Sequence, residues 1–223
     1  MLDHLHRDGE ADSHLTASAV GIDCANLLLM GITQYYTATT IDGYIADEHN
    51  SLSWLFEVPA GDDEVGHEVR FAAFMADVGA IVMGSTTFEW VIEHEQLLEH
   101  PEKWRAFYGD TPTWVFTHRD LPSFEGADIR FVQGDVRPIH AAMVEAAGDK
   151  NIWIVGGGEL VGQFADAGLL DEIQLSIAPV TLGAGAPLLP RRLLASDLTL
   201  VNLERQGQFV SATYRVTRAA DRG

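Results

Sequence analysis

Residues 152–162 read IWIVGGGELVG, and this stretch decides the fold class. Its first four residues form an apolar run typical of a buried strand, and the residues after the glycines have the spacing of a helix. Three consecutive glycines, Gly156, Gly157 and Gly158, connect the two. Glycine allows positive φ and lets the backbone approach a ligand without Cβ obstruction. One or two glycines would suffice for a tight turn, so three predict a strand-to-helix junction that binds a ligand.

The junction does not match two common nucleotide-binding motifs. The interval from Gly158 to Gly162 is one residue too long for the dinucleotide fingerprint G-x-G-x-x-G. No Lys-Ser or Lys-Thr pair follows the glycines, so the stretch is not a P-loop.

A second junction of the same kind reads IVMGSTTFE over residues 81–89. Its apolar strand delivers Gly84 and three hydroxyl residues to a helix N-terminus, where free N–H groups and the helix dipole attract an anion. A third strand end supplies Thr117, His118 and Arg119. The Arg119 guanidinium could bind a phosphate with two hydrogen bonds, or it could be an ordinary solvated loop arginine.

The rest of the chain alternates strand and helix patterns. The sequence predicts strands over residues 32–40, 80–83, 113–117, 129–132, 151–155 and 172–178, helices over 65–77, 88–98, 138–147 and 159–167, and a hairpin from 198–204 and 209–217. Successive β-α-β units predict an α/β protein with helices on both faces of a mixed, mostly parallel sheet of about eight strands. The hairpin would add an antiparallel edge. In such a sheet, ligands bind at the carboxyl ends of the strands, where all three junctions emerge.

Composition excludes several classes of partner. The 223 residues include 14 Lys+Arg and 33 Asp+Glu, giving a net charge of −19, and 47% are hydrophobic. Such a chain folds, and it does not attract nucleic acid or an anionic membrane. No apolar run is long enough for a membrane span. One cysteine, Cys24, cannot form an internal disulfide, and no Cys/His spacing resembles a zinc site, so we expect a cytoplasmic protein without a metal. We expect residues 1–29 to be a poorly ordered extension and residues 30–223 to form one domain.

Four sequence blocks, in this order, resemble the dihydrofolate reductase superfamily over residues 31–217. They are TIDGYIA at 40–46, GSTTFE at 84–89, VGGG at 155–158 with QF at 163–164, and LDEI at 170–173 with APVTLGAG at 178–185. The last block is most similar to the C-terminal reductase domain of bifunctional riboflavin-biosynthesis deaminase-reductase proteins. The resemblance implies the three-layer dihydrofolate-reductase-like fold, an NADPH-dependent oxidoreductase, and a homodimer.

The resemblance also implies where the cofactor would bind. Nicotinamide would lie under Ile45 and Ala46. The adenosine end would be held by Gly84, Ser85, Thr86, Thr87, Thr117, His118 and Arg119, and the pyrophosphate by Gly156, Gly157, Gly158, Glu159 and Leu160. Ser85 stands where folate reductases usually have a phosphate-binding arginine, so recognition of the 2′-phosphate would fall to Arg119 and nearby hydroxyls.

The substrate is less well defined. Asp42 is a candidate proton donor, although an Asp-Gly pair after a strand is first of all a turn. Trp54 could stack on a planar heterocycle. The carboxylate that grips the pteridine in folate reductases follows this tryptophan by five residues, and here that position is Pro59, which disfavours dihydrofolate reduction.

The riboflavin-type substrate, 5-amino-6-(5-phosphoribosylamino)uracil, carries a phosphate. From Asp42 to Gly84 the chain has nine acids and only Arg70 as a base, which argues against an anionic substrate. The resemblance therefore implies an NADPH-dependent reductase of a small heterocyclic substrate, similar to 5-amino-6-(5-phosphoribosylamino)uracil reductase, and the acidic segment favours an uncharged substrate. Dihydrofolate reduction, a nucleotide-binding module without turnover, and a flavin-using relative remain as alternatives.

Overall fold

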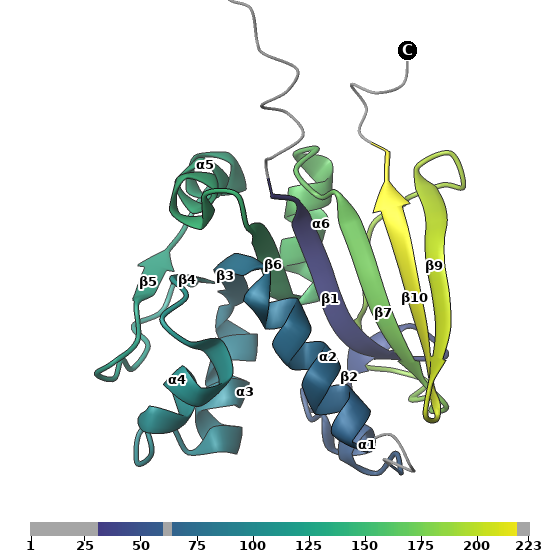
Figure 1. Ribbon diagram of the computed structural model, residues 1–223, viewed down its shortest axis with the longest axis horizontal. Coiled ribbons are helices and arrows are strands. Elements are labelled where there is room, and N and C mark those ends of the chain that lie inside the picture. Colours follow the sequence, from purple (N-terminus) through teal and green to yellow (C-terminus); the bar gives the residue numbers. More distant parts are fainter. Residues whose placement is uncertain (1–30, 60–63, 218–223) are drawn as a thin grey trace, which may run out of the picture.

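The computed structural model describes residues 31–59 and 64–217, and the expected extension over residues 1–29 lies outside them. Eight strands form one sheet in the order β5-β4-β3-β6-β1-β7-β10-β9, and β2 pairs with β8 in a small second sheet (Figure 1). The pairs from β5 to β7 are all parallel, and β10 and β9 are antiparallel. The predicted mixed sheet with its C-terminal hairpin is confirmed.

The strands have the following bounds: β1 Thr33–Thr40, β2 Tyr44–Ala46, β3 Val78–Gly84, β4 Thr113–Phe116, β5 Ile129–Val132, β6 Asn151–Gly156, β7 Glu172–Ala178, β8 Ala186–Pro187, β9 Leu198–Gln206 and β10 Phe209–Val216. The helices are α1 Ser53–Phe56, α2 Glu64–Ala76, α3 Ser85–Glu95, α4 Glu102–Tyr108, α5 Val136–Ala147 and α6 Gly158–Asp166.

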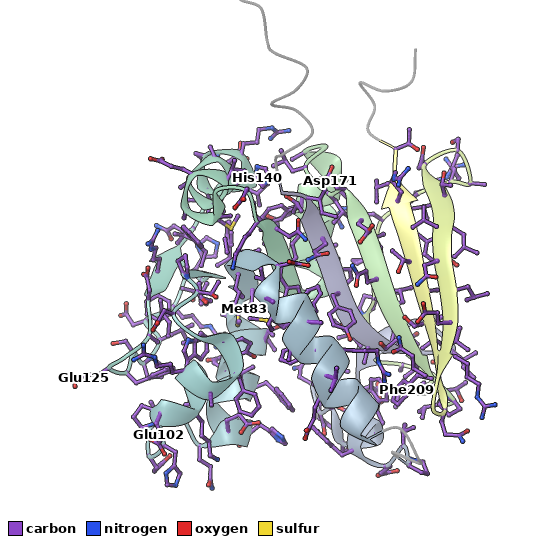
Figure 2. The ribbon with its side chains drawn as sticks, in the orientation of Figure 1. Met83, Glu102, Glu125, His140, Asp171 and Phe209 are labelled. Carbon is purple, nitrogen blue, oxygen red and sulfur yellow. The ribbon has the colours of Figure 1, made fainter. Side chains whose placement is uncertain are left out.

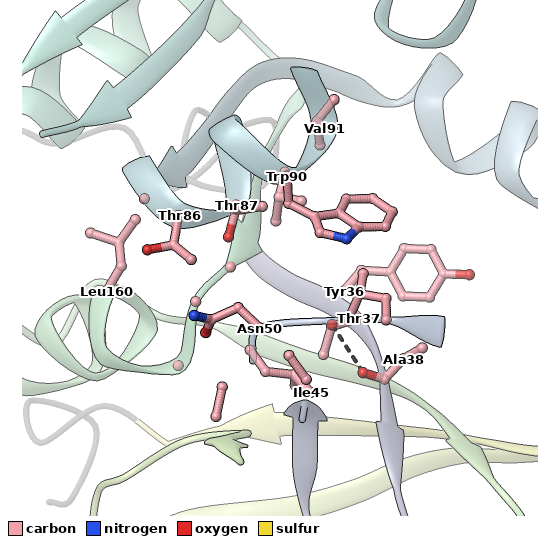
Figure 3. A pocket seen from close by; sticks show the side chains of 18 of the residues that line it. Tyr36, Thr37, Ala38, Ile45, Asn50, Thr86, Thr87, Trp90, Val91 and Leu160 are labelled. Atoms are coloured by element: carbon pink, nitrogen blue, oxygen red, sulfur yellow. Dashed lines mark hydrogen bonds between the residues drawn. The ribbon is translucent and has the colours of Figure 1, made fainter. Parts of the chain in front are cut away.

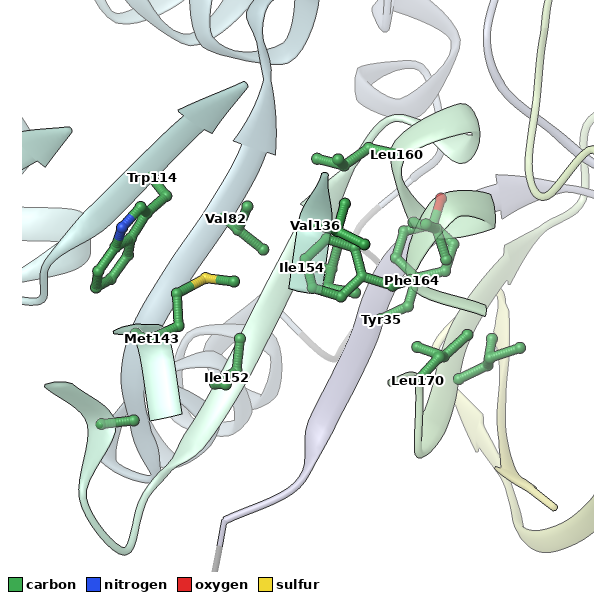
Figure 4. Packing of buried hydrophobic residues seen from close by; sticks show 14 residues of the cluster. Tyr35, Val82, Trp114, Val136, Met143, Ile152, Ile154, Leu160, Phe164 and Leu170 are labelled. Atoms are coloured by element: carbon green, nitrogen blue, oxygen red, sulfur yellow. The ribbon is translucent and has the colours of Figure 1, made fainter. Parts of the chain in front are cut away.

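Two hydrophobic cores lie on opposite faces of the sheet, because successive side chains of a strand point to opposite faces. Ile152 and Ile154 of β6 pack in the core beneath α5 and α6 (Figure 4). Trp153, between them, belongs to the second core with Phe88 of α3. Met83 is also in that second core, at the centre of the molecule in Figure 2. The protein therefore has three layers, with α5 and α6 on one face and α2, α3 and α4 on the other.

The centre of the sheet contains a topological switch point. Strand β6 is inserted between β3 and β1, although β4 and β5 precede it in the chain. The helix after β3 packs on one face and the helix after β6 packs on the other. The N-termini of α3 and α6 therefore diverge from two adjacent strands, which is the place where open α/β sheets bind ligands.

Helix α3 differs from its prediction. It begins at Ser85, three residues before the predicted start, because Gly84 is an extended N-cap (ψ 163°) that starts the helix directly after β3. It ends when Gln96 adopts a left-handed conformation (φ 54°). The sequence analysis did not predict α1, α4, β2 and β8, which have between two and seven residues each.

Candidate functional site

A cavity of about 1590 Å³ opens at the carboxyl ends of the parallel strands. All fourteen residues predicted to bind the cofactor line it: Ile45, Ala46, Gly84, Ser85, Thr86, Thr87, Thr117, His118, Arg119, Gly156, Gly157, Gly158, Glu159 and Leu160. The register of the sheet explains why distant segments meet here, because Met83 pairs with Gly156 and Gly84 with Phe116. The three junctions therefore lie side by side in one site.

Two helix N-termini face this cavity without a side-chain cap. Gly84 caps α3 and Gly157 caps α6, and neither cap has a side chain to bond the first N–H groups of its helix. In α5, by contrast, the Asp135 side chain accepts a hydrogen bond from the N–H of Arg137. The first N–H groups of α3 and α6 are therefore available to an anionic ligand, and both helix dipoles favour one.

Glycine is present at each of the three consecutive positions for a different reason. Gly156 has φ +152°, which residues with a side chain rarely adopt. At Gly158, a Cβ would lie 2.2 Å from the carbonyl oxygen of Pro187, so packing requires glycine. At Gly157, φ is −87° and a Cβ would meet only the Ile45 Cδ1 atom, 3.9 Å away. Packing does not require glycine at position 157, and a ligand lying against the backbone there would.

Gly84 repeats the pattern at the other helix. Its backbone is extended (φ −82°), and a Cβ would have no neighbour closer than 3.8 Å. A Cβ would therefore fit at both helix N-termini without a clash, so internal packing does not require glycine at either position. Such a cradle fits the pyrophosphate of a dinucleotide, which binds to backbone N–H groups at close approach.

Arg119 lies next to the first turn of α3. Its Nη1 donates to Glu89 Oε1 (2.9 Å) and its Nη2 to Glu89 Oε2 (2.6 Å), and Nη2 also donates to the Ser85 hydroxyl (3.0 Å). The Thr117 hydroxyl accepts a hydrogen bond from the Arg119 backbone N–H (2.9 Å). The arginine is thus held at the cavity by defined contacts and is not a freely solvated loop residue.

Glu159, in the first turn of α6, is neutralised by Arg191. Arg191 donates to both carboxylate oxygens of Glu159 (2.7 and 2.9 Å) and to Asp166 (2.7 Å). The hydrogen bonds from Arg191 lower the pKa of Glu159. Gly162 makes this arrangement possible, because a Cβ there would lie 2.7 Å from the Arg191 guanidinium carbon. The carboxylate beside the α6 N-terminus therefore does not repel an anion with its full charge.

Aromatic side chains line the other end of the cavity. Figure 3 shows Thr86, Thr87 and Leu160 toward one end and the rings of Tyr36 and Trp90 toward the other. The ring of Phe56 stacks on His94 (4.9 Å between centroids), as does that of Trp90 (4.5 Å), so the α1 segment is attached to α3. The local sequence does not single out Tyr36, Phe56 or Trp90 as site residues. The spacing of Thr86 and Trp90, four residues apart on one helix face, was the available signal.

The two candidate catalytic residues do not line the cavity. The Asp42 carboxylate accepts hydrogen bonds from the Thr40 hydroxyl and from the N–H groups of Leu182 and Gly183, and these bonds lower its pKa. Trp54 is 5% exposed, and its indole N–H has no hydrogen-bond partner. The structure thus brings together the predicted cofactor residues and leaves these two outside.

The described residues contain neither a metal-binding cluster nor a membrane-spanning helix. No group of three or more His, Cys, Asp or Glu among them could hold a metal ion. No helix among them has the length and apolar character required to cross a membrane.

Comparisons with known proteins identify relatives of this chain. Residues 90–211 match the family model of the RibD C-terminal domain. Protein YwjB of Bacillus subtilis (strain 168) is 31% identical over 182 residues, which cover 82% of this chain and 96% of YwjB. A solved structure from Shewanella sp. PV-4, provisionally assigned to riboflavin biosynthesis, is 27% identical with a TM-score of 0.64, covering 84% of this chain and 99% of that one.

A more distant match confirms the fold. Dihydrofolate reductase from Enterococcus faecalis, solved in complex with NADP(H), is 14% identical with a TM-score of 0.51. The match covers 85% of this chain and 98% of that enzyme. The dihydrofolate-reductase-like fold predicted from the sequence blocks is therefore confirmed.

Proposed function

This chain belongs to the RibD C-terminal domain family, a family of reductases with a dihydrofolate-reductase-like fold, and from that premise we propose that it is an NADPH-dependent reductase of a small heterocyclic substrate. The observation that carries the proposal is the bare backbone at Gly84 and Gly157. It faces the cavity at two uncapped helix N-termini, and no internal contact requires glycine there.

Different segments of the cavity lining would bind different parts of the cofactor. The backbone from Gly156 to Leu160 would hold the pyrophosphate, and Gly84–Thr87 with Thr117–Arg119 the adenosine end. Ile45 and Ala46, which line the same cavity, would cover the nicotinamide. When bound, the nicotinamide supplies the hydride, and the protein supplies orientation and exclusion of water. The E. faecalis relative, whose structure contains NADP(H), supports a nicotinamide cofactor.

The aromatic end of the cavity favours a planar heterocycle as substrate. Tyr36, Trp90 and Phe56 line the cavity there, and aromatic rings can stack on a planar ring system. Arg70 is the only Arg or Lys between Asp42 and Gly84, and Glu68 lies near it on α2 in the cavity lining. A C=N or carbonyl group on an uncharged ring fits this lining better than a ribose phosphate does. We therefore expect an uncharged heterocyclic substrate rather than a phosphoribosylaminouracil.

Two finer points belong to the same proposal. We propose that the protein is cytoplasmic, because its one cysteine is compatible with a reducing compartment. We also propose that it is a homodimer, because edge strand β9 exposes large apolar residues: Leu200, Val201 and Leu203.

The experiment that tests the proposal compares three proteins. Gly157→Asp places a carboxylate in the cradle, where the fold has room for it, and should weaken NADPH binding at least about a hundredfold. Ala142→Asp adds the same charge to the exposed face of α5 and should bind like the wild type. Binding is measured by nicotinamide fluorescence. Unchanged affinity in Gly157→Asp would show that the pyrophosphate lies elsewhere.

Turnover is tested separately with the wild type. Loss of nicotinamide absorbance in the presence of one member of a panel of pterins, aminouracils and cyclic imines supports the reductase. Tight binding without oxidation across the panel would favour a nucleotide-binding module.

A further inference from the structure

Arg119, at the α3 end of the cavity, is hydrogen-bonded to the carboxylate of Glu89. Both terminal nitrogens of Arg119 donate to Glu89, at 2.9 and 2.6 Å, and the closer one also bonds Ser85. Ser85 and Glu89 are four residues apart on α3, so they lie on the same face of the helix. The three side chains form one cluster that begins at the cavity lining and extends one helical turn away from it.

The cluster contains two groups with opposite preferences for the cofactor. An arginine fork binds a phosphate with two charge-assisted hydrogen bonds, whereas a carboxylate binds a ribose hydroxyl and repels a phosphate. NADPH and NADH differ only in that phosphate, on the 2′ oxygen of the adenosine ribose. In the present arrangement Glu89 accepts the two hydrogen bonds that Arg119 would donate to a 2′-phosphate. The carboxylate also compensates the positive charge of the guanidinium.

We propose that Glu89 is a specificity-determining residue that lowers the preference of this protein for NADPH over NADH. The inference rests on the proposed function, because it requires the adenosine end of the cofactor to lie against Ser85 and Arg119. With the carboxylate present, the two cofactors bind with affinities that differ by less than about tenfold. Without it, Arg119 is released to bind the 2′-phosphate, and the preference for NADPH increases.

The ion pair can be removed without loss of the fold. The side chain of Glu89 is 41% exposed and that of Arg119 is 56% exposed. Pairs with this degree of exposure contribute little to stability, because water and salt screen them. A change in ligand affinity in a Glu89 variant therefore reflects the binding site and not a loss of folding. An unchanged Tm of the variant would show that the fold is intact.

The test uses Glu89→Gln, which keeps the shape of the side chain and removes its charge. Glu93→Gln is the matched control, because Glu93 is an exposed acid on the same helix that does not line the cavity. A third protein, Glu89→Gln with Arg119→Ala, shows whether a gain depends on the arginine. The probes are NADPH and NADH, followed by fluorescence, and adenosine 2′,5′-bisphosphate and AMP, followed by calorimetry, which isolate the adenosine end from any turnover.

The expected result is a rise of about tenfold or more in the ratio of NADPH to NADH affinity in Glu89→Gln. The ratio for adenosine 2′,5′-bisphosphate over AMP should rise in parallel. Glu93→Gln should match the wild type, and the gain should disappear in the double variant. The gain should also decrease at high salt, because it is a contact between charges.

Two results would overturn the inference and are distinguishable from each other. If both dinucleotides bind and Glu89→Gln changes their affinities equally or not at all, Glu89 does not discriminate and the proposed function stands. If neither dinucleotide binds to the wild type or to Glu89→Gln, both the inference and the proposed function fail.

Discussion

Asp42 joins two loops of the protein. Its carboxylate is bonded to the Thr40 hydroxyl in its own turn and to the N–H of Gly183 (2.7 Å), which is more than a hundred residues away in the chain. The Thr40 hydroxyl and the backbone of Gly183 favour the ionised form, so the pKa of Asp42 is lower than its usual value. At the scale of the residue, Asp42 acts as a connection between the β1–β2 turn and the loop after β7.

The lowered pKa has a consequence for stability. A carboxyl group whose folded-state pKa is depressed stabilises the fold above its unfolded pKa of about 3.9, and the contribution disappears as the pH falls through the folded value. We expect Asp42→Asn to lower the Tm slightly at neutral pH, because the exposed carboxylate is screened by water. The difference from the wild type should decrease in acid, and calorimetry across the pH range measures it. A constant difference at all pH values would contradict this account.

The neighbouring glycines could be predicted from the sequence as a group, but not one by one. Their contiguity, between an apolar strand and a helix, showed that the backbone turns there. The reason for Gly158 depends on a partner far away in the chain, because its Cβ would clash with the carbonyl oxygen of Pro187. Tyr36 and Phe56 were not predicted as site residues because they come from elements that the topology, and not the local sequence, brings to the cavity.

At the scale of the element, the position of α6 is set by the contacts of its first residue, Gly158. Gly158 lies against the backbone of Pro187 and Leu188, and the side chains of Leu160, Val161 and Phe164 are buried beneath the helix. The absence of a side chain at Gly158 thus lets α6 pack closely against the β8 segment, and we propose that the preceding position contacts the ligand.

Alanine substitutions separate these two roles. We expect Gly158→Ala to cost about 1–3 kcal/mol or more, because its Cβ would overlap two backbone carbonyl groups. Gly157→Ala should keep the Tm within about 2 °C of the wild type, since its Cβ meets no close neighbour. Thermal denaturation of both variants is the measurement. Equal destabilisation of the two would show that Gly157 has a structural reason after all.

The longer elements were predictable for a physical reason. Strands β3 and β6 are buried on both faces and appear in the sequence as continuous apolar runs. By contrast, β8 has two residues and α1 has four, so neither contains a full period of any pattern. Helix α4 has seven residues, and its position after Pro101 is set by packing of Trp104 against Phe88.

At the scale of the whole molecule, acidity is distributed over the domain and is locally neutralised where the cofactor would bind. Glu89 and Glu159, at the two helices that face the cavity, each pair with an arginine. The net charge of −19 disfavours polyanionic partners, while these two ion pairs offset the carboxylates near the helix N-termini.

The exposed edge of the sheet yields a prediction about assembly. On β9, Leu203 is 60% exposed and Leu200 is 49% exposed, and the strand is the last in the sheet. We expect the mass of a dimer by light scattering, and a shift to monomer in Leu203→Lys, with Glu204→Lys on the same strand as the control. A monomeric mass for the wild type would contradict the proposed homodimer.

The central claim is that the cavity between α3 and α6 binds a nicotinamide dinucleotide. Titration of the wild-type protein with NADPH, followed by nicotinamide fluorescence and by Tm, tests it most directly. We predict saturable binding and a Tm that rises with ligand concentration, by mass action on the folded state. No change in either signal at millimolar NADPH would contradict the claim.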